Sequence, residues 1–426
     1  MKVVFNFLFL FNLSLTGYSQ NELQSFANKN SVAINYILPD STDFSDLENI
    51  GNAIGDSRIV MLGEQDHGDA PTFLAKTRLI NYLHTIKGFN VIAFESDFFS
   101  ATFGFENMAK TKQDYLKFYK ANIVPYWTLS DACSSLFTKL VPESLTSPNP
   151  LIIAGFDNQM FYKYSASKLS KAIDSLTKKN DLPILNDQST YTNILLSIDT
   201  LSNSFFCTTK SKKYYKQSII NLSKLKKEFE SKTGNQDISC ILIDNLLSFA
   251  NQLLKKNDFT AMVNIRDIQM AANLKWLCDI KFAKEKIIVW AANYHISKYM
   301  GHFKKKNLND NISMATEFVK DSELNNKTYV IGFTSFDGEA GRIGTKTFAV
   351  DKPDKNGFET WINPMFDYAF TDFKKFNSSY PNFDKEFELK SCVSDNNVHK
   401  SYPAQWNKIF DGMFFIRHMY PCKIKN

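Results

Sequence analysis

The chain has 426 residues, of which 44% are hydrophobic and 22% are charged. These proportions are ordinary for a globular protein, and the length excludes a single small core and fits one large domain or two. The formal net charge is +6, and we interpret lysine clusters such as residues 210–217 as solvated helix faces. No nucleic-acid-binding motif accompanies them, so we expect no nucleic-acid partner.

The first residues have the features of an export signal. Lys2 is followed by a mostly apolar stretch, residues 3–15, and by the small residues Gly17 and Ser19. This pattern predicts a signal peptide over residues 1–19. The stretch is too short to span a bilayer comfortably, and no later segment is long and apolar enough to do so. We therefore expect an exported mature protein, periplasmic or secreted, without a membrane partner.

The most informative stretch follows at residues 59–68. An apolar run over residues 59–62 ends at Gly63, which predicts a buried strand that leads into a tight turn. The turn carries Glu64, Asp66 and His67 within four residues. Titratable side chains held together at the carboxyl end of a strand are typical of acid–base chemistry.

The next segment predicts a helix and a second strand. Apolar residues recur at helical spacing over residues 73–86, and Gly88 is a helix stop signal. A second apolar run over residues 91–94 ends at Glu95. The strand, helix and strand together have the length that a parallel crossover needs.

The same pattern recurs further along the chain. Apolar runs at 151–154, 287–292 and 329–333 lead into polar residues that include Asp157, His295 and Asp337, and a further strand is expected at 413–416. We therefore predict an α/β fold with a mostly parallel central sheet flanked by helices. In such a sheet the carboxyl ends of the strands line one crevice, which favours an enzyme.

A long helical segment interrupts this pattern. Residues 159–282 are rich in Leu, Ile, Lys and Ser at helical spacing, with amphipathic stretches such as residues 219–230. We expect a large inserted helical bundle that covers the crevice.

The six cysteines show no spacing typical of a zinc site or a redox motif. Export makes disulfides possible, so Cys392 and Cys422 are candidates for a C-terminal disulfide. The alternative is six separate, mostly buried thiols.

Three of the strand-end residues are suited to acid–base chemistry. His67, Glu95 and His295 each follow an apolar run, and Glu64 lies close to His67 in the turn. Histidine is the natural general base near neutral pH, and a neighbouring carboxylate can orient it. Alternatively, Glu95 is a buried ion-pair partner of Arg78 or Lys76. The other histidines lack such a context.

With these motifs in order, the chain resembles the erythromycin esterase family. The resemblance rests on residues 63–68 (GEQDHG), 76–79 (KTRL) and 93–95 (AFE), followed by residues 155–157 (GFD), Arg266 with Asp267, residues 290–295 (WAANYH) and 331–333 (IGF). It extends over about residues 46–415. It implies one hydrolase domain over residues 20–426, with the helical insertion inside it.

The resemblance also implies roles for individual residues in a metal-independent reaction. His67 would activate water as the general base, Glu95 and Glu64 would orient water and the imidazoles, and His295 would assist at the carbonyl or the leaving alkoxide. Lys76, Arg78, Asp157 and Arg266 would bind substrate, and Asp267 would support them. The implied substrate is a macrolactone or a related small-molecule ester, with no cofactor, and macrolide resistance would follow from such an activity.

Three positions depart from the family pattern. Ala292 stands where the family often has a second histidine, Asp66 stands where it has threonine, and Pro71 replaces a common acidic residue. These departures leave two alternatives open. Glu64, His67, Glu95 and His295 could bind a divalent metal in a metal-dependent hydrolase, or the scaffold could bind a large ligand such as haem without catalysis.

Overall fold

The computed structural model describes residues 20–203, 208–303, 310–391 and 399–425. Its main sheet has the strand order β1-β8-β11-β6-β2-β5-β3-β4, and β7 pairs with β6. A separate pair is formed by β9 and β10. The strands are β1 (Val32–Ala33), β2 (Ile59–Leu62), β3 (Phe89–Asp97), β4 (Ile152–Asp157), β5 (Lys286–Trp290), β6 (Thr328–Ala340), β7 (Phe348–Ala349), β8 (Tyr368–Asp372), β9 (Phe387–Leu389), β10 (Tyr402–Ala404) and β11 (Gly412–Met419).

The centre of the sheet is parallel. The strand β2 lies between β5 and β6, β3 lies between β5 and β4, and β11 pairs with β6, all in parallel register. In the described part of this sheet, the antiparallel pairings are β1 with β8, β8 with β11, and the short β7 with β6. The predicted fold class is therefore confirmed, and the carboxyl ends of β2, β3, β4 and β5 meet at one edge of the sheet.

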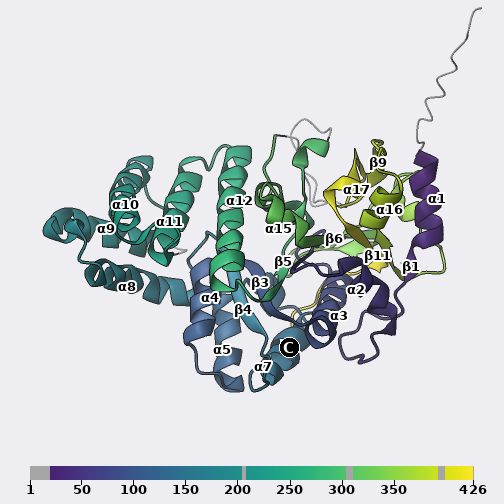
Figure 1. The fold of residues 1–426 in the computed structure, drawn as a ribbon, viewed down its shortest axis with the longest axis horizontal. Helices are drawn as coiled ribbons and strands as arrows, with labels where there is room; N and C mark the ends of the chain where they lie inside the picture. Colours follow the sequence, from purple (N-terminus) through teal and green to yellow (C-terminus); the bar gives the residue numbers. More distant parts are fainter. Residues whose placement is uncertain (1–19, 204–207, 304–309, 392–398, 426) are drawn as a thin grey trace, which may run out of the picture.

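Helices cover both faces of the sheet (Figure 1). The α-helices are α1 (Gln20–Asn30), α2 (Glu48–Ile54), α3 (Ala70–Lys87), α4 (Phe98–Asn107), α5 (Lys112–Asn122), α6 (Pro125–Thr128), α7 (Val141–Ser144), α8 (Lys163–Lys179), α9 (Gln188–Leu201), α10 (Lys212–Thr233), α11 (Ile238–Leu254), α12 (Phe259–Trp276), α13 (Asn293–Ile296), α14 (Met314–Phe318), α15 (Ser322–Asn326), α16 (Phe373–Ser379) and α17 (Trp406–Ile409).

The residues of β2 show why both faces are covered. Ile59 and Met61 pack into one hydrophobic core with α1, α12, α14 and α16, whereas Val60 and Leu62 pack into a second core with α2, α3 and α5. Successive side chains of a strand point to opposite faces, so a strand that is apolar at every position needs a layer on each side.

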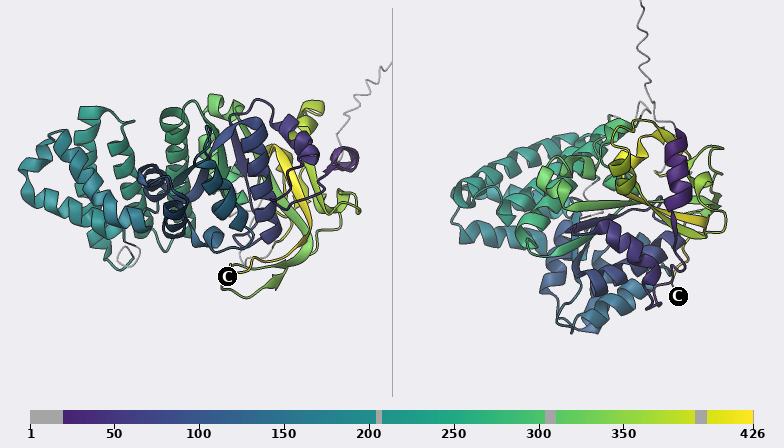
Figure 2. Two further views of the ribbon diagram at one scale, coloured as in Figure 1. Left: turned by 90° about the horizontal axis from the view of Figure 1, so that it is seen from below. Right: turned by 45° about the vertical axis from the view of Figure 1, so that its right-hand side comes forward.

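The helices α8–α11 extend beyond the β4 end of the sheet, and α12 lies between them and the strands (Figures 1 and 2). All five fall within the range predicted to be helical. Among the described residues of these helices, only Arg266 of α12 lines the cavity at the strand ends. The bundle therefore contributes to that cavity through α12, and the buried residues of its other helices belong to the same hydrophobic core as one face of the sheet.

Two predicted boundaries differ from the structure. Glu95 lies inside β3 rather than after it, because a register irregularity between Phe94 and Asp97 lets the strand continue to the cavity. The strand predicted at residues 329–333 extends to Ala340, because its second half pairs with β11 and β7. A strand at residues 413–416 was predicted, but local patterns do not show that it pairs with this half of β6.

The free edge of β4 is closed by side chains. The Thr102 hydroxyl accepts a hydrogen bond from the Gly155 amide at 3.0 Å and donates one to its carbonyl at 3.3 Å. On α12, Asn273 donates to the Phe156 carbonyl at 2.9 Å. These contacts satisfy backbone groups that an edge strand would otherwise expose.

None of the described helices has the length and apolar character needed to cross a membrane. The predicted signal peptide at residues 1–19 lies outside the described residues. Cys392, one half of the predicted disulfide, also lies outside them. Cys133, Cys240, Cys278 and Cys422 are free thiols.

Candidate active site

A cavity of about 270 Å³ lies at the carboxyl ends of the parallel strands. It brings together side chains that are far apart in the sequence, and most of them are polar or charged. They come from the turn after β2, the ends of β3 and β4, the segment after β4, the segment after β5, the loop after β6, α12, and α6 with the residue before it. The lining residues are His67, Glu95, Ser96, Asp97, Val124, Tyr126, Trp127, Asp157, Gln159, Tyr162, Arg266, His295 and Arg342.

The turn after β2 holds His67 against Glu64. The imidazole Nδ1 lies 2.7 Å from Glu64 Oε1, and the other carboxylate oxygen accepts a hydrogen bond from Lys76 Nζ at 2.6 Å. The side chains of Glu64 and Lys76 are both fully buried, while that of His67 is 18% exposed. A ring bound through Nδ1 leaves Nε2 for the cavity, so Glu64 fixes which nitrogen of His67 can meet a ligand.

Gly63 allows this turn to pack closely against the segment after β5. A Cβ atom at this position would lie 1.9 Å from Asn293 Oδ1. Asn293 Oδ1 accepts a hydrogen bond from the Phe333 backbone amide. The side-chain nitrogen of Asn293 donates to the Phe333 and Ser391 carbonyls. The glycine is therefore needed for a close approach rather than for an unusual backbone angle.

Aromatic side chains fix the ring of His67. Tyr126 stacks on the imidazole with ring centroids 5.4 Å apart, and Trp127 meets it edge-on at 5.9 Å. The Trp127 indole also donates to Glu64 Oε1 at 3.1 Å. These contacts restrict the orientation of His67 from two sides.

A second histidine of the cavity wall, His295, is held by two carboxylates. The imidazole Nδ1 lies 2.7 Å from Asp267 Oδ1, and Nε2 lies 3.1 Å from Glu95 Oε1. Burial alone would lower the pKa of His295, but the charges of Asp267 and Glu95 outweigh it and raise the pKa to about 10. His295 is therefore protonated and positively charged at neutral pH.

Arg266 completes this side of the cavity. Its Nη2 lies 2.6 Å from Asp157 Oδ2 and 2.9 Å from Glu95 Oε1. Although burial would raise the pKa of Glu95, the positive charges of His295 and Arg266 hold it well below its usual range. Glu95 is thus a fixed carboxylate between two cations, and its other oxygen accepts a hydrogen bond from the Ala292 amide at 3.1 Å.

Arg342 lines the cavity from the loop after β6. Its Nε donates to Asp66 Oδ1 at 2.6 Å, and its guanidinium carbon lies 5.6 Å from the ring centroid of Tyr126. Asp66 is buried, with 1% of its side chain exposed. Asp66, one of the positions that depart from the family pattern, therefore forms an ion pair with Arg342, which lines the cavity.

The predicted site residues divide into two groups. His67, Glu95, His295, Asp157 and Arg266 line the cavity, while Glu64 and Lys76 lie behind His67. Arg78 does not belong to the site: its guanidinium binds Asp46 at 2.7 Å and the carbonyls of Tyr36 and Asp43. Glu95 pairs with neither Lys76 nor Arg78, but with Arg266 and His295.

Sequence reasoning missed several residues of the cavity wall. Trp127, Tyr126 and Tyr162 come from segments without a strand-end motif, and Arg342 follows β6 at a distance from any predicted strand end. Asp97 follows Glu95 in the same strand, and burial raises its pKa to about 6. Its place two residues after Glu95 was a signal that could have identified it.

Comparisons with known proteins agree with this architecture. The family model named erythromycin esterase matches residues 84–419. YbfO from Bacillus subtilis, which carries the name of a hydrolase, is 27% identical over 311 residues, which are 69% of this chain and 68% of YbfO.

Solved structures share the fold at low sequence identity. A succinoglycan biosynthesis protein has a TM-score of 0.71 at 18% identity, covering 95% of this chain and 99% of its own. A Bacillus cereus protein has a TM-score of 0.72 at 17% identity, and the match covers 96% of this chain and 100% of that protein. The third structure is an erythromycin esterase, EreC, with a histidine-to-asparagine substitution and in its open conformation. It has a TM-score of 0.69 at 15% identity, and the match covers 91% of this chain and 97% of EreC.

Proposed function

The chain belongs to the erythromycin esterase family, and we propose that it hydrolyses a carboxylic ester or lactone with water activated by His67. One observation carries this proposal: a histidine paired with a single carboxylate and a protonated histidine line the same cavity. The two rings are thereby suited to different tasks, because His67 can accept a proton whereas His295 carries a positive charge that can stabilise developing negative charge electrostatically.

His67 is the proposed general base. With Nδ1 held by Glu64 at 2.7 Å, its Nε2 takes a proton from water as the water oxygen attacks the ester carbonyl. Glu64 stabilises the imidazolium that forms, as the buried carboxylate does in other histidine-based hydrolases. Lys76 and Trp127 hold Glu64 in place, so they are positioning residues.

His295 and Arg266 are the proposed electrophilic side. Both are cations that face the cavity, so they can stabilise the oxyanion of the tetrahedral intermediate. The intermediate then collapses: the bond from the carbonyl carbon to the alkoxy oxygen breaks, and the leaving oxygen takes a proton from the imidazolium of His67. One ester and one water give one acid and one alcohol.

The cavity favours a compact, polar substrate. Its volume of about 270 Å³ lies just below the range that encloses drug-sized ligands. Glu95, Asp157, Arg266 and Arg342 give it a charged wall. A macrolactone, as the family resemblance implies, is the larger alternative, and macrolide resistance would require that alternative.

Mass spectrometry of purified protein with a panel of esters tests the proposal. Small polar esters and lactones and a set of macrolides are scored for the gain of one water. We expect His67→Ala to lower kcat/KM about 10²- to 10⁴-fold. His418→Ala, at an exposed histidine paired with Asp337, is the matched control. A loss of less than tenfold for His67→Ala would overturn the role of His67. A pure binding protein would hydrolyse nothing in the panel.

The pairing of charges favours a metal-independent reaction over the metal-dependent alternative. Glu64 is engaged by Lys76 and Glu95 by Arg266, so both carboxylates already have cations. In the described part of the chain, no three His, Cys, Asp or Glu side chains are placed to hold a metal ion. We expect full activity after dialysis against a chelator, verified by metal analysis. Loss of activity that returns with a divalent metal would support the alternative.

Export is proposed on the N-terminal sequence. The charged start, apolar stretch and small residues before Gln20 are the features of a cleaved signal. We expect the mature chain to start at Gln20 and to occur in the periplasm or the medium. N-terminal sequencing of fractionated protein tests this, and an intact Met1 in the cytoplasmic fraction would overturn it.

A further inference from the structure

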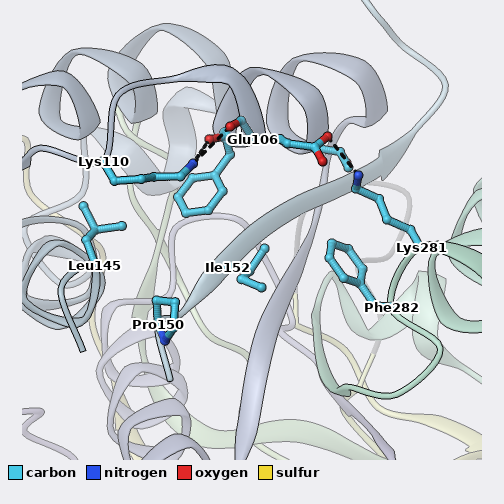
Figure 3. Close-up of a pocket in the computed structure, with 9 residues that line it drawn as sticks. Glu106, Lys110, Leu145, Pro150, Ile152, Lys281 and Phe282 are labelled. Carbon is cyan, nitrogen blue, oxygen red and sulfur yellow. Dashed lines mark hydrogen bonds and ion pairs between the residues drawn. The ribbon is translucent and has the colours of Figure 1, made fainter. Parts of the chain in front are cut away.

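A second cavity, of about 340 Å³, lies at the other end of β4 (Figure 3). It is lined by Ile152, the first residue of β4, by residues of α4, and by the segments that precede β4 and β5. The lining residues are Thr102, Phe105, Glu106, Lys110, Leu145, Pro150, Ile152, Lys281 and Phe282. The proposed active site lies at Asp157, the last residue of β4, about 16 Å along the strand.

The walls of this cavity are mainly apolar. Phe105 is almost fully buried at 4% exposure, and Ile152 lies between the two lysines in Figure 3. The Thr102 hydroxyl in this wall already has partners, because it is hydrogen-bonded to the Gly155 backbone. The volume is within the range of small-molecule sites.

The charges at its rim do not cancel. Glu106 pairs with Lys281 at 2.9 Å, and Figure 3 shows this pair on the side away from Lys110. Lys110 donates to the backbone carbonyls of Phe105 and Glu106. Among the described residues, no carboxylate forms an ion pair with Lys110, so the rim carries one excess positive charge.

The environment of Lys110 favours an anion. Its Nζ lies 4.1 Å from the ring centroid of Phe105. Partial burial lowers the pKa of Lys110, although the charge of Glu106 opposes this effect. The two carbonyls satisfy donors of the ammonium group but do not neutralise it, and a third donor remains.

We propose that this cavity binds a small amphipathic monoanion, a medium-chain carboxylate of about eight to twelve carbons. The chain packs against Phe105, Ile152 and Phe282, and the carboxylate lies beside Lys110. This site is separate from the cavity at the strand ends, so binding does not require His67 or Arg266.

Calorimetric titration of the purified mature protein with decanoate tests the proposal, with decanol as the neutral analogue. We expect a dissociation constant on the order of 10–100 µM for decanoate. Lys110→Met should weaken decanoate about three- to fivefold and leave decanol unchanged. Ile152→Trp, which fills the cavity, should weaken both ligands at least tenfold.

Three controls keep the result interpretable. Lys168→Met removes an exposed lysine of α8 and should bind decanoate as the unaltered protein does. His67→Ala should also retain binding, because it lies in the other cavity. Lys110→Glu, an exposed change that does not disturb the core, should weaken decanoate more than Lys110→Met. Two results would overturn the proposal. One is absence of decanoate binding at 1 mM, about tenfold above the upper end of the expected range of dissociation constants. The other is unchanged decanoate binding by both Lys110→Glu and Ile152→Trp.

Discussion

Glu64 lies at the centre of the buried charges behind His67, and Glu64→Gln is the sharpest test of their arrangement. The substitution keeps the shape of the side chain but removes the charge that faces Lys76 at 2.6 Å. Both side chains are fully buried, so Lys76 would lose its counter-charge in a site that water does not reach. Removing one partner of a buried pair costs about 3–5 kcal/mol, a large part of the roughly 5–15 kcal/mol that stabilises a folded domain.

The pH dependence of this cost has a definite sign. Burial already lowers the pKa of Lys76, and Glu64 opposes the effect. Without Glu64, the pKa of Lys76 falls further below its value in the unfolded chain. Between these two pKa values the unfolded state binds the extra proton, so the stability of the variant rises with pH. Urea unfolding of Glu64→Gln at pH 6 and pH 9 measures this difference.

A double variant separates stability from catalysis. Glu64→Gln with Lys76→Met replaces the pair by groups without charge, which often restores stability, but it still lacks the carboxylate that orients His67. We expect near-normal unfolding and a kcat/KM lowered about 10²-fold or more. Glu230→Gln, which removes a partly exposed helical pair with Lys226, should cost less than about 1 kcal/mol. A cost below 1 kcal/mol for Glu64→Gln itself would refute the reasoning.

Three further substitutions test other contacts of the cavity. Asp267→Asn should lower the pKa of His295 from about 10, so the alkaline decline of kcat/KM should move to lower pH; an unmoved profile would count against His295 as the cation. Arg342→Ala removes the positively charged partner of buried Asp66, and we expect KM to rise several-fold with kcat nearly unchanged, measured by initial rates. Gly63→Ala places a Cβ atom 1.9 Å from Asn293 Oδ1 and should cost about 1–3 kcal/mol in thermal unfolding, so an unchanged melting temperature would contradict the close approach.

The sequence was sufficient to predict the strand-end residues, for a physical reason. Buried parallel strands are mostly apolar, so the polar residues at or just beyond the end of each apolar run mark the carboxyl end of the strand. His67, Glu95, Asp157 and His295 follow this pattern, and the structure places all four around one cavity. Their roles in catalysis remain a proposal that the variants above test.

The structure places Arg78 away from the cavity, and helix geometry explains why. Lys76 and Arg78 are two residues apart on α3, and such residues point to nearly opposite sides of a helix. Lys76 reaches Glu64 behind the cavity, whereas Arg78 reaches Asp46 near α2. The helical period alone therefore shows that the two basic residues could not both face the same site.

The remaining cavity residues could not be predicted, because their partners are distant in the sequence. Arg342 is 276 residues from Asp66, and Trp127 is 63 residues from Glu64. Neither contact has a periodic pattern or a turn signal of its own. Each contact depends on which loops the strand order brings together. Local periodicity does not predict the order β11-β6-β2-β5-β3.

This dependence also changes the meaning of the departures from the family pattern. Considered singly, Asp66 adds an acidic group beside the proposed base. In the structure its carboxylate binds Arg342, so the pair adds no net charge and fixes one wall of the cavity. Ala292 supplies a backbone amide to Glu95, a contact that any residue except proline can make. Alanine in place of the histidine at that position therefore leaves the hydrogen bond that holds Glu95 intact.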